Sequence, residues 1–184
     1  QRLAITPASL VEIKADDNVS IVRALITDAV KPGDIFQPMH WSAAFANAAL
    51  VNCCTPSSVD PISGQPALKS ACVSVTPFTA AWHGFGVSQQ SFKPETEYSA
   101  TRPISGGIAF ECAGSASPRD WGLLLYNALV GSGEISTLHS NDTASFRCVV
   151  MREGKLDFAF FALRGPVQVS RTWLEAKLGG DANP

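Results

Sequence analysis

The chain has 184 residues, a formal net charge of -2, 46% hydrophobic residues and 16% charged residues. That length suffices for one domain, or one and a half, with a hydrophobic core of its own. The charged share is low against the usual share of about a quarter, so we expect a surface poor in charge that packs in part against something else. The charge balance excludes a basic field for nucleic acid or an anionic membrane, and no apolar stretch reaches the roughly 20 residues that span a bilayer.

Five cysteines are present, and no pair of them has the CxxC spacing of a metal site. They are Cys53, Cys54, Cys72, Cys112 and Cys148. We expect them to be buried free thiols in a reducing cytosol, which predicts a cytoplasmic protein. Residues 1–4 lead directly into strand-like sequence without a signal peptide or an initiator methionine. The expectation is a chain that is processed or excised from something longer.

The first region reads as β-strands. Residues 9–14 alternate apolar and polar side chains, and residues 19–27 are rich in β-branched residues, so the two stretches predict a hairpin. A turn at residues 31–34 leads into a short predicted strand at 34–39, and residues 68–75 predict another. About four strands are too few to close a barrel. We therefore expect a mainly β region whose partner half is missing.

The second region predicts a small α+β unit. Its pattern indicates strands, a polar loop and two helices, of which the first begins at Ser117-Pro118 and the second follows Ser170. The expected elements are an extended segment at 80–88, a loop at 89–101, strands at 104–112 and 134–139, a hairpin of 144–152 with 155–163, and helices at 117–131 and 172–178.

The sequence offers no catalytic group and no metal site of its own. His40, His83 and His139 have no ligand spacing. The GxSxG nucleophile elbow and both glycine-rich phosphate motifs are absent from the sequence. A self-contained enzyme is therefore not indicated.

A binding constellation lies between His40 and Lys69. Asn52 and Asp60 can match the donor and acceptor edge of a guanine or a pterin. His40 and Trp41 can cover a ring face, and Lys69 supplies a point charge for a diphosphate. The alternative is an ordinary surface loop with Asx and Ser turns and a solvated Lys69. The residues alone leave both interpretations open.

The stretch GDIFQPMHWSAAFANAALVN followed by DPISGQPALK resembles the C-terminal dinucleotide-binding domain of bacterial molybdopterin oxidoreductases, and most of all that of assimilatory nitrate reductases. The matching positions are Gly33, Ile35, Phe36, Pro38, Met39, His40, Trp41, Asn52, Thr55, Asp60, Pro61, Ser63, Pro66 and Lys69. The opening LAITPASLVEIKADD departs from the family at Ala4 and at residues 7–9, where a tight turn would be altered. The match is firm over residues 20–76 and looser elsewhere.

The resemblance implies a double-psi β-barrel of the aspartate-decarboxylase-like type, incomplete here, over residues 1–78, with a C-terminal α+β extension over 79–184. It implies binding of bis(molybdopterin guanine dinucleotide) with molybdenum, for the two-electron reduction of nitrate to nitrite. The iron–sulfur cluster would belong to the missing N-terminal part. The partners would be the remaining domains of the same enzyme, with an electron donor that the sequence leaves unnamed, and the fragment alone would be inactive. The alternatives are another molybdopterin oxidoreductase, such as a formate dehydrogenase or a separate small dinucleotide-binding subunit, and a non-enzymatic interaction barrel.

The resemblance also assigns roles to particular residues. Asn52 and Lys69 match cofactor-contacting positions, and His40 and Trp41 match a motif that faces the pterin or the substrate funnel. The remaining positions, Thr55 and Asp60, match residues that hold the loop. Asn52 could instead cap the loop, and Trp41 could instead belong to the core.

Overall fold

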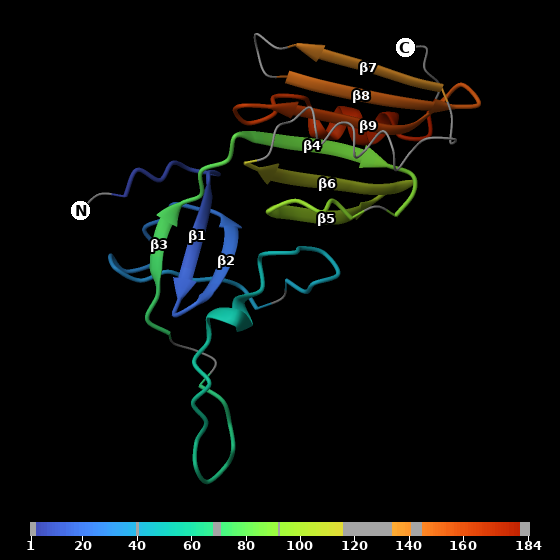
Figure 1. Cartoon of the computed structure of the whole chain (residues 1–184). Coiled ribbons are helices and arrows are strands. Elements are labelled where there is room, and N and C mark those ends of the chain that lie inside the picture. The colour runs from blue at the N-terminus through green and yellow to red at the C-terminus, as the bar shows by residue number, and fades with distance from the viewer. Residues whose placement is uncertain are drawn as a thin grey trace. The chain divides into compact units, whose positions relative to one another are not determined.

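The computed structural model describes residues 3–39, 41–67, 71–91, 93–115, 134–140 and 145–180. The chain divides into two compact units, residues 1–79 (unit 1) and residues 80–184 (unit 2). Each unit is built on one antiparallel sheet, as Figure 1 shows. The expectation of a mainly β, α+β chain is confirmed.

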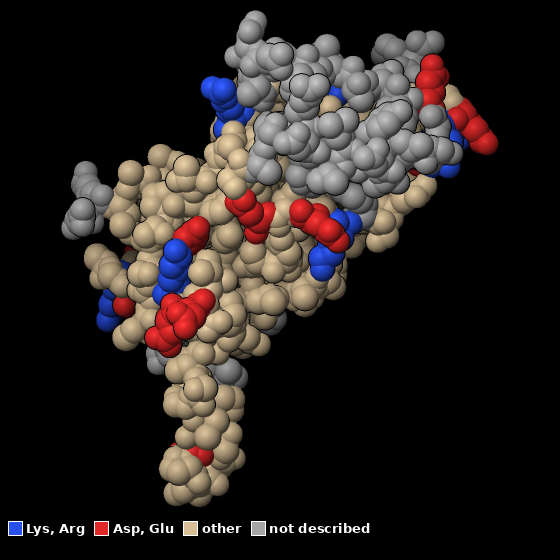
Figure 2. Space-filling model, viewed as in Figure 1, with Lys and Arg blue, Asp and Glu red and all other residues tan. Residues whose placement is uncertain are grey.

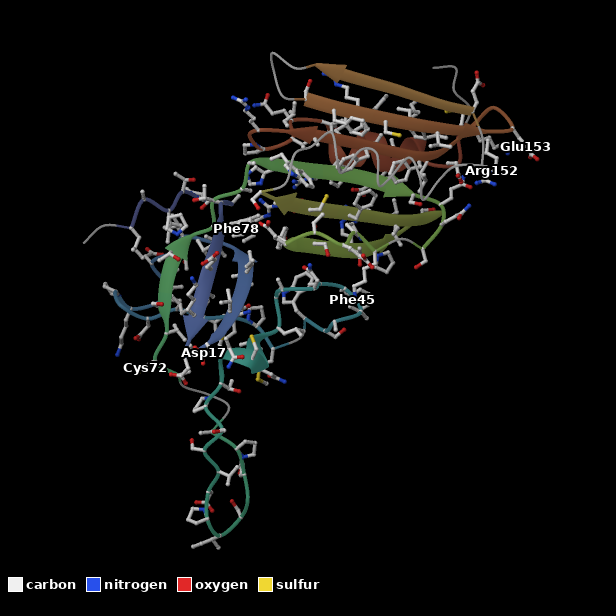
Figure 3. All side chains as sticks on the ribbon, in the orientation of Figure 1. Asp17, Phe45, Cys72, Phe78, Arg152 and Glu153 are labelled. Carbon is white, nitrogen blue, oxygen red and sulfur yellow. The ribbon has the colours of Figure 1, made fainter. Side chains whose placement is uncertain are left out.

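The sheet of unit 1 has the strand order β2-β1-β3. Strand β1 (Leu10–Ala15) pairs with β2 (Asn18–Arg23) as the predicted hairpin, and its other edge pairs with β3 (Ser74–Pro77). The β1–β2 turn lies at Asp16 and Asp17, where Asp16 has a φ of 51°, and Figure 3 labels Asp17 there. Aspartate tolerates this left-handed conformation better than most residues, which explains why the acidic turn ends β1.

The core of unit 1 is small and lies between its sheet and the chain that precedes a short 3-10 helix, η1 (Val51–Cys54). Its buried apolar residues are Leu10, Val11, Ile13, Ile21, Ala46, Ala49 and Cys54. The backbone N–H of Ile21 donates to the carbonyl of Ala48 at 2.7 Å. This bond ties the segment before η1 to strand β2.

One strand prediction in unit 1 is wrong, and a second is confirmed only at its end. Residues 34–39 do not pair into a sheet, although the turn before them forms, with the N–H of Asp34 bonded to the carbonyl of Lys31. Pro38 has no N–H to give to a ladder, which weakens this stretch as a strand. The predicted strand at 68–75 begins only at Ser74 among the described residues. The described part of unit 1 thus contains three strands and no closed barrel.

The described residues of unit 2 form a six-stranded sheet with the order β5-β6-β4-β9-β8-β7. Its strands are β4 (Trp82–Ser88), β5 (Tyr98–Ile104), β6 (Gly107–Gly114), β7 (Glu134–Ser140), β8 (Ser145–Arg152) and β9 (Lys155–Leu163). Four predicted segments are confirmed as β4, β6, β7 and the β8–β9 hairpin. The hairpin turns at Glu153 and Gly154, both with positive φ, at the end labelled in Figure 3. This is the twist that a two-residue turn needs.

Strand β5 contradicts the prediction of a loop over residues 89–101. Its first residues, Tyr98 and Ser99, are buried and pair with Ala113 and Cys112 of β6. The segment contains Ser, Thr, Arg and Pro, which made it look like a loop in the sequence. As an edge strand it tolerates Pro103. The predicted helix at 117–131 lies outside the described residues.

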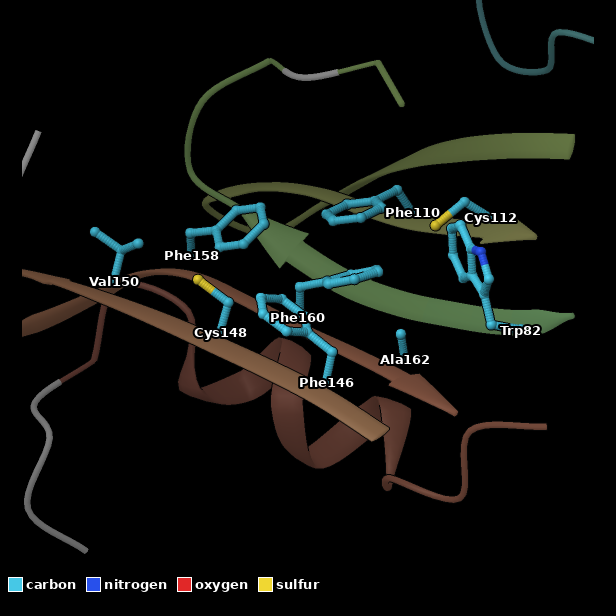
Figure 4. Packing of buried hydrophobic residues seen from close by; sticks show 9 residues of the cluster. All are labelled: Trp82, Phe110, Cys112, Phe146, Cys148, Val150, Phe158, Phe160 and Ala162. Atoms are coloured by element: carbon cyan, nitrogen blue, oxygen red, sulfur yellow. The ribbon is translucent and has the colours of Figure 1, made fainter. Parts of the chain in front are cut away.

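One face of the unit 2 sheet carries an aromatic cluster, shown in Figure 4. Phe110 stacks on Phe160 with ring centroids 5.8 Å apart and planes at 11°. The rings lie against the glycines of β4: a Cβ on Gly84 would lie 2.6 Å from Phe160, and one on Gly86 would lie 2.4 Å from Phe110. The GFG sequence, which does not form a phosphate loop, therefore makes room for two aromatic rings.

The opposite face is covered by helix α2 (Arg171–Lys177), close to the predicted helix at 172–178. Ser170 caps it by accepting a hydrogen bond from the N–H of Trp173 at 3.3 Å. Leu174 packs with Phe85 and Val87 of β4. Two ion pairs hold the helix to the sheet, one between Arg171 and Glu111 at 2.6 Å and one between Arg102 and Glu175.

Candidate functional site

The adjacent cysteines fasten the 3-10 helix η1 to the sheet of unit 1. The Cys54 thiol lies 3.6 Å from the carbonyl oxygen of Ile13 in β1, and the Cys53 thiol donates to the carbonyl of Leu50 at 2.7 Å. The two sulfur atoms are 3.7 Å apart, so they are in contact without being bonded. The two thiols therefore have a packing role, and their contacts fix the backbone of η1, which includes Asn52.

All five cysteines are free, as the sequence analysis expected. Burial raises the pKa of the Cys54 thiol to about 11, and contact with the Cys53 thiol adds to the rise. Cys112 and Cys148 are also buried, whereas Cys53 is half-buried and Cys72 is exposed. The expectation of uniformly buried thiols is therefore wrong for Cys72, which Figure 3 labels on the chain that leads into β3.

Asn52 presents its side chain from η1 to solvent. Its backbone carbonyl accepts hydrogen bonds from the N–H of Thr55 at 3.4 Å and from the Thr55 hydroxyl at 2.9 Å. The Asn52 carboxamide has no hydrogen-bond partner within the part of the chain that the structure describes. Because Thr55 closes the helix end, Asn52 is not needed as the cap, and its donor and acceptor face outward.

Asp60 organises the tip of the next loop. Its Oδ1 accepts hydrogen bonds from the N–H of Ile62 at 3.0 Å, the N–H of Ser63 at 2.7 Å and the Ser63 hydroxyl at 2.9 Å. These bonds, led by the backbone N–H of Ser63, lower the pKa of the Asp60 carboxyl. A carboxylate that is committed to three donors of its own loop holds that loop in shape.

Trp41 lies on the surface with 44% of its area exposed, so it does not belong to the core of unit 1. The structure thus joins Asn52 and Thr55 directly. Within the described residues, no hydrogen bond joins Trp41 or Asp60 to Asn52. The other two candidates, His40 and Lys69, lie outside the described residues.

The structure adds one positioning pair that the sequence analysis missed. Gln37 donates from Nε2 to the hydroxyl of Ser20 at 2.8 Å, and the same nitrogen lies 3.4 Å from the carbonyl of Ala49. Ser20 is fully buried in β2. A glutamine between an aromatic residue and a proline gave no signal of a buried partner seventeen positions earlier in the chain.

No three histidine, cysteine or acidic side chains among the described residues gather closely enough to ligate a metal ion. None of the helices in those same ranges has the length and apolar character of a membrane span.

The exposed Asn52 carboxamide on η1, beside a loop held by its own hydrogen bonds, is the candidate ligand-binding feature of unit 1. Residues 1–72 match the family described as the molydopterin dinucleotide binding domain. The chain is also 32% identical over 122 residues to a nitrate reductase of Klebsiella oxytoca, a match that covers 66% of this chain and 14% of that protein. No solved structure gives a significant match.

Two further nitrate reductases are similar to shorter parts of the chain. The identity is 43% over 56 residues for the protein of Synechocystis sp. and 37% over 65 residues for that of Shewanella frigidimarina. These matches cover 30% and 35% of this chain, and 8% and 7% of the two relatives. Residues 1–72 therefore match a molydopterin dinucleotide binding domain, and the chain is nitrate reductase-like in sequence. It spans no more than 14% of the length of these relatives.

Proposed function

We propose that this chain is the part of a cytoplasmic molybdenum-dependent nitrate reductase that grips bis(molybdopterin guanine dinucleotide). The family match over residues 1–72 and the similarity to three nitrate reductases support the cofactor class and the substrate. The five free thiols support a reducing compartment. When bound, the molybdenum centre would supply the two-electron chemistry that reduces nitrate to nitrite.

Asn52 is the observation that carries this proposal. Its carboxamide offers two donors and an acceptor to solvent, and these suit the polar edge of a guanine or a pterin. The backbone beneath it is fixed by the thiols of Cys53 and Cys54 and by Thr55. A rigid support of this kind lowers the entropy that is lost when a ligand binds.

The other motif residues take supporting parts. Trp41, exposed at 44%, is available to cover a ring face, and we propose the same for its neighbour His40. Lys69 would place a positive charge beside the diphosphate. Thr55 and Asp60 shape the backbone, Thr55 at the end of η1 and Asp60 at the loop tip. We further propose that residues 1–78 form the cofactor-binding portion and residues 79–184 its extension, that an iron–sulfur cluster belongs to a preceding domain, and that the isolated chain is inactive.

The test is cofactor occupancy of the full-length enzyme, measured by mass spectrometry of the released pterin dinucleotide and by metal analysis. Asn52→Ala is expected to weaken retention about tenfold, as loss of a hydrogen-bonding amide can do. Asn47→Ala is the matched control, because Asn47 is also exposed in this loop and has no counterpart in the motif. Lys69→Ala is expected to lower occupancy as well. Unchanged occupancy in Asn52→Ala, with the melting temperature preserved, would contradict the proposal.

A further inference from the structure

Residues 56–67, called the arm here, form an exposed projection from unit 1. Every residue of the arm is exposed, and the arm extends beyond η1 and folds back on itself (Figure 1). Its two large aliphatic side chains, Ile62 and Val59, are 96% and 56% exposed. The arm therefore places apolar area in solvent without contributing any buried residue to the core of unit 1. Such area on an otherwise folded chain is typical of a contact surface.

The arm is ordered by its own hydrogen bonds. Val59 and Pro66 form an isolated antiparallel bridge, and the N–H of Ala67 donates to the carbonyl of Ser58 at 3.1 Å. Nearer the tip, the N–H of Asp60 donates to the carbonyl of Gln65 at 2.9 Å. Three prolines in the arm further restrict the backbone. A preorganised arm loses little conformational entropy when it docks.

The arm carries little charge. Asp60 is its one charged residue, and Figure 2 shows red on the projection at one place only. The Oδ1 of that carboxylate is turned to the N–H groups of Ile62 and Ser63, which belong to the same loop. The arm has no cationic side chain that would favour an acidic partner or a nucleic acid.

We propose that the arm docks Ile62 and Val59 into an apolar socket formed by another part of the same polypeptide, outside these 184 residues. This inference rests on the proposed function, because it needs the longer enzyme. The arm lies within the stretch matched by the cofactor-domain family, and this chain spans 14% or less of the relatives, so most of the surface such a domain would meet is elsewhere. A rigid contact with an apolar tip and a single charge, which is hydrogen-bonded within the arm, suits a permanent interface between domains.

The test is site-specific photo-crosslinking in the full-length holoenzyme. A benzophenone amino acid replaces Ile62 in one variant and Asp17 in the other, where Asp17 is an exposed residue of the β1–β2 turn. Irradiated protein is digested and the linked peptides are identified by mass spectrometry. The expected result is a link from position 62 to a peptide of the same chain outside the 184 residues, and none from position 17. A link confined to residues 1–184, a link to a second copy or to another protein, or no link at position 62 would overturn the proposal.

A second measurement uses milder substitutions. Limited proteolysis of the full-length enzyme should cleave within the arm at least about tenfold faster in Ile62→Asp than in Ile62→Leu, since a buried carboxylate would expel the tip from an apolar socket. Equal rates in the two variants would also contradict docking. Cofactor content is measured on the same preparations. A cofactor-free enzyme with the expected link contradicts the proposed function, whereas a loaded enzyme without the link contradicts only the arm.

Discussion

Gln37 donates a hydrogen bond to the hydroxyl of Ser20 at 2.8 Å, and Ser20 is completely buried in strand β2. Gln37 belongs to the segment that leads towards Trp41 and η1. The same amide nitrogen also reaches the carbonyl of Ala49, just before η1. The Gln37 side chain therefore links the sheet of unit 1 to the segment that carries Asn52. It positions the candidate site but is not one of the proposed cofactor contacts.

Gln37→Leu is expected to destabilise unit 1 by about 1–3 kcal/mol, because it leaves the buried Ser20 hydroxyl without its partner. The double variant Ser20→Ala/Gln37→Leu should lose less than the sum of the two single variants, since the unpaired hydroxyl is then gone. Urea unfolding of the chain measures both effects. Gln90→Leu, at an exposed position of unit 2, is the control and should stay within about 0.5 kcal/mol of the parent. Additive losses in the double variant would contradict the coupling.

Gly86→Ala is expected to destabilise unit 2 by about 1–3 kcal/mol or more through overpacking. The new Cβ would lie 2.4 Å from the Phe110 ring and 2.6 Å from the carbonyl oxygen of Ala159, and the backbone atom cannot move aside easily. Gly165→Ala is the matched control, because a Cβ there meets nothing within 4 Å. Thermal unfolding of both variants measures the difference. Equal melting temperatures would show that the aromatic cluster yields more readily than its packing suggests.

The two confirmed hairpins show which parts of the fold could be predicted from the sequence. Alternating side chains around Asp16-Asp17 and around Glu153-Gly154 specify both the strands and the turn between them. Strand β5 was missed because its pairing with β6, and not its own polar composition, makes residues 98–104 a strand. The opposite error was made at residues 34–39, where an apolar pattern found no strand to pair with.

Some residues of the candidate site could likewise be predicted from the sequence, and others could not. Asn52 and Asp60 could be singled out because each belongs to a motif that is local in the sequence. The contact between Gln37 and Ser20 depends on how the segment before η1 returns to β2, and no local pattern encodes that path. The role of the GFG sequence was equally hidden, since it is set by aromatic rings from β6 and β9.

The buried thiols predict an alkaline loss of stability. Burial raises the pKa of Cys148 from an ordinary 9.0 to about 11, so the folded state keeps a proton that the unfolded state releases. The stabilisation is fully present below about pH 9 and is lost as the pH rises through about 11, where the folded thiol also ionises. The free energy of unfolding, measured by denaturant between pH 8 and pH 11, should fall less steeply in Cys148→Ala than in the parent. Cys72→Ala, at an exposed position, should keep the parental slope, and equal slopes for all three proteins would contradict this account.

The lowered pKa of Asp60 predicts that the tip of the arm keeps its order in mild acid. Three donors of Ile62 and Ser63 stabilise the charged form, so the carboxylate stays ionised below its ordinary pKa of 3.8. The order of the tip is therefore present above pH 3.8 and is lost as the pH falls through the lower, folded pKa. Amide chemical shifts of Ile62 and Ser63, followed by NMR during an acid titration, should stay constant from neutral pH to about pH 4 and change below it. Asp60→Asn keeps an acceptor oxygen but does not titrate, so its shifts at these two amides should lack the acid transition. Asp60→Ala should speed exchange of the same amides about tenfold at neutral pH, because their acceptor is gone. An identical acid transition in the parent and in Asp60→Asn would mean that another group controls the tip.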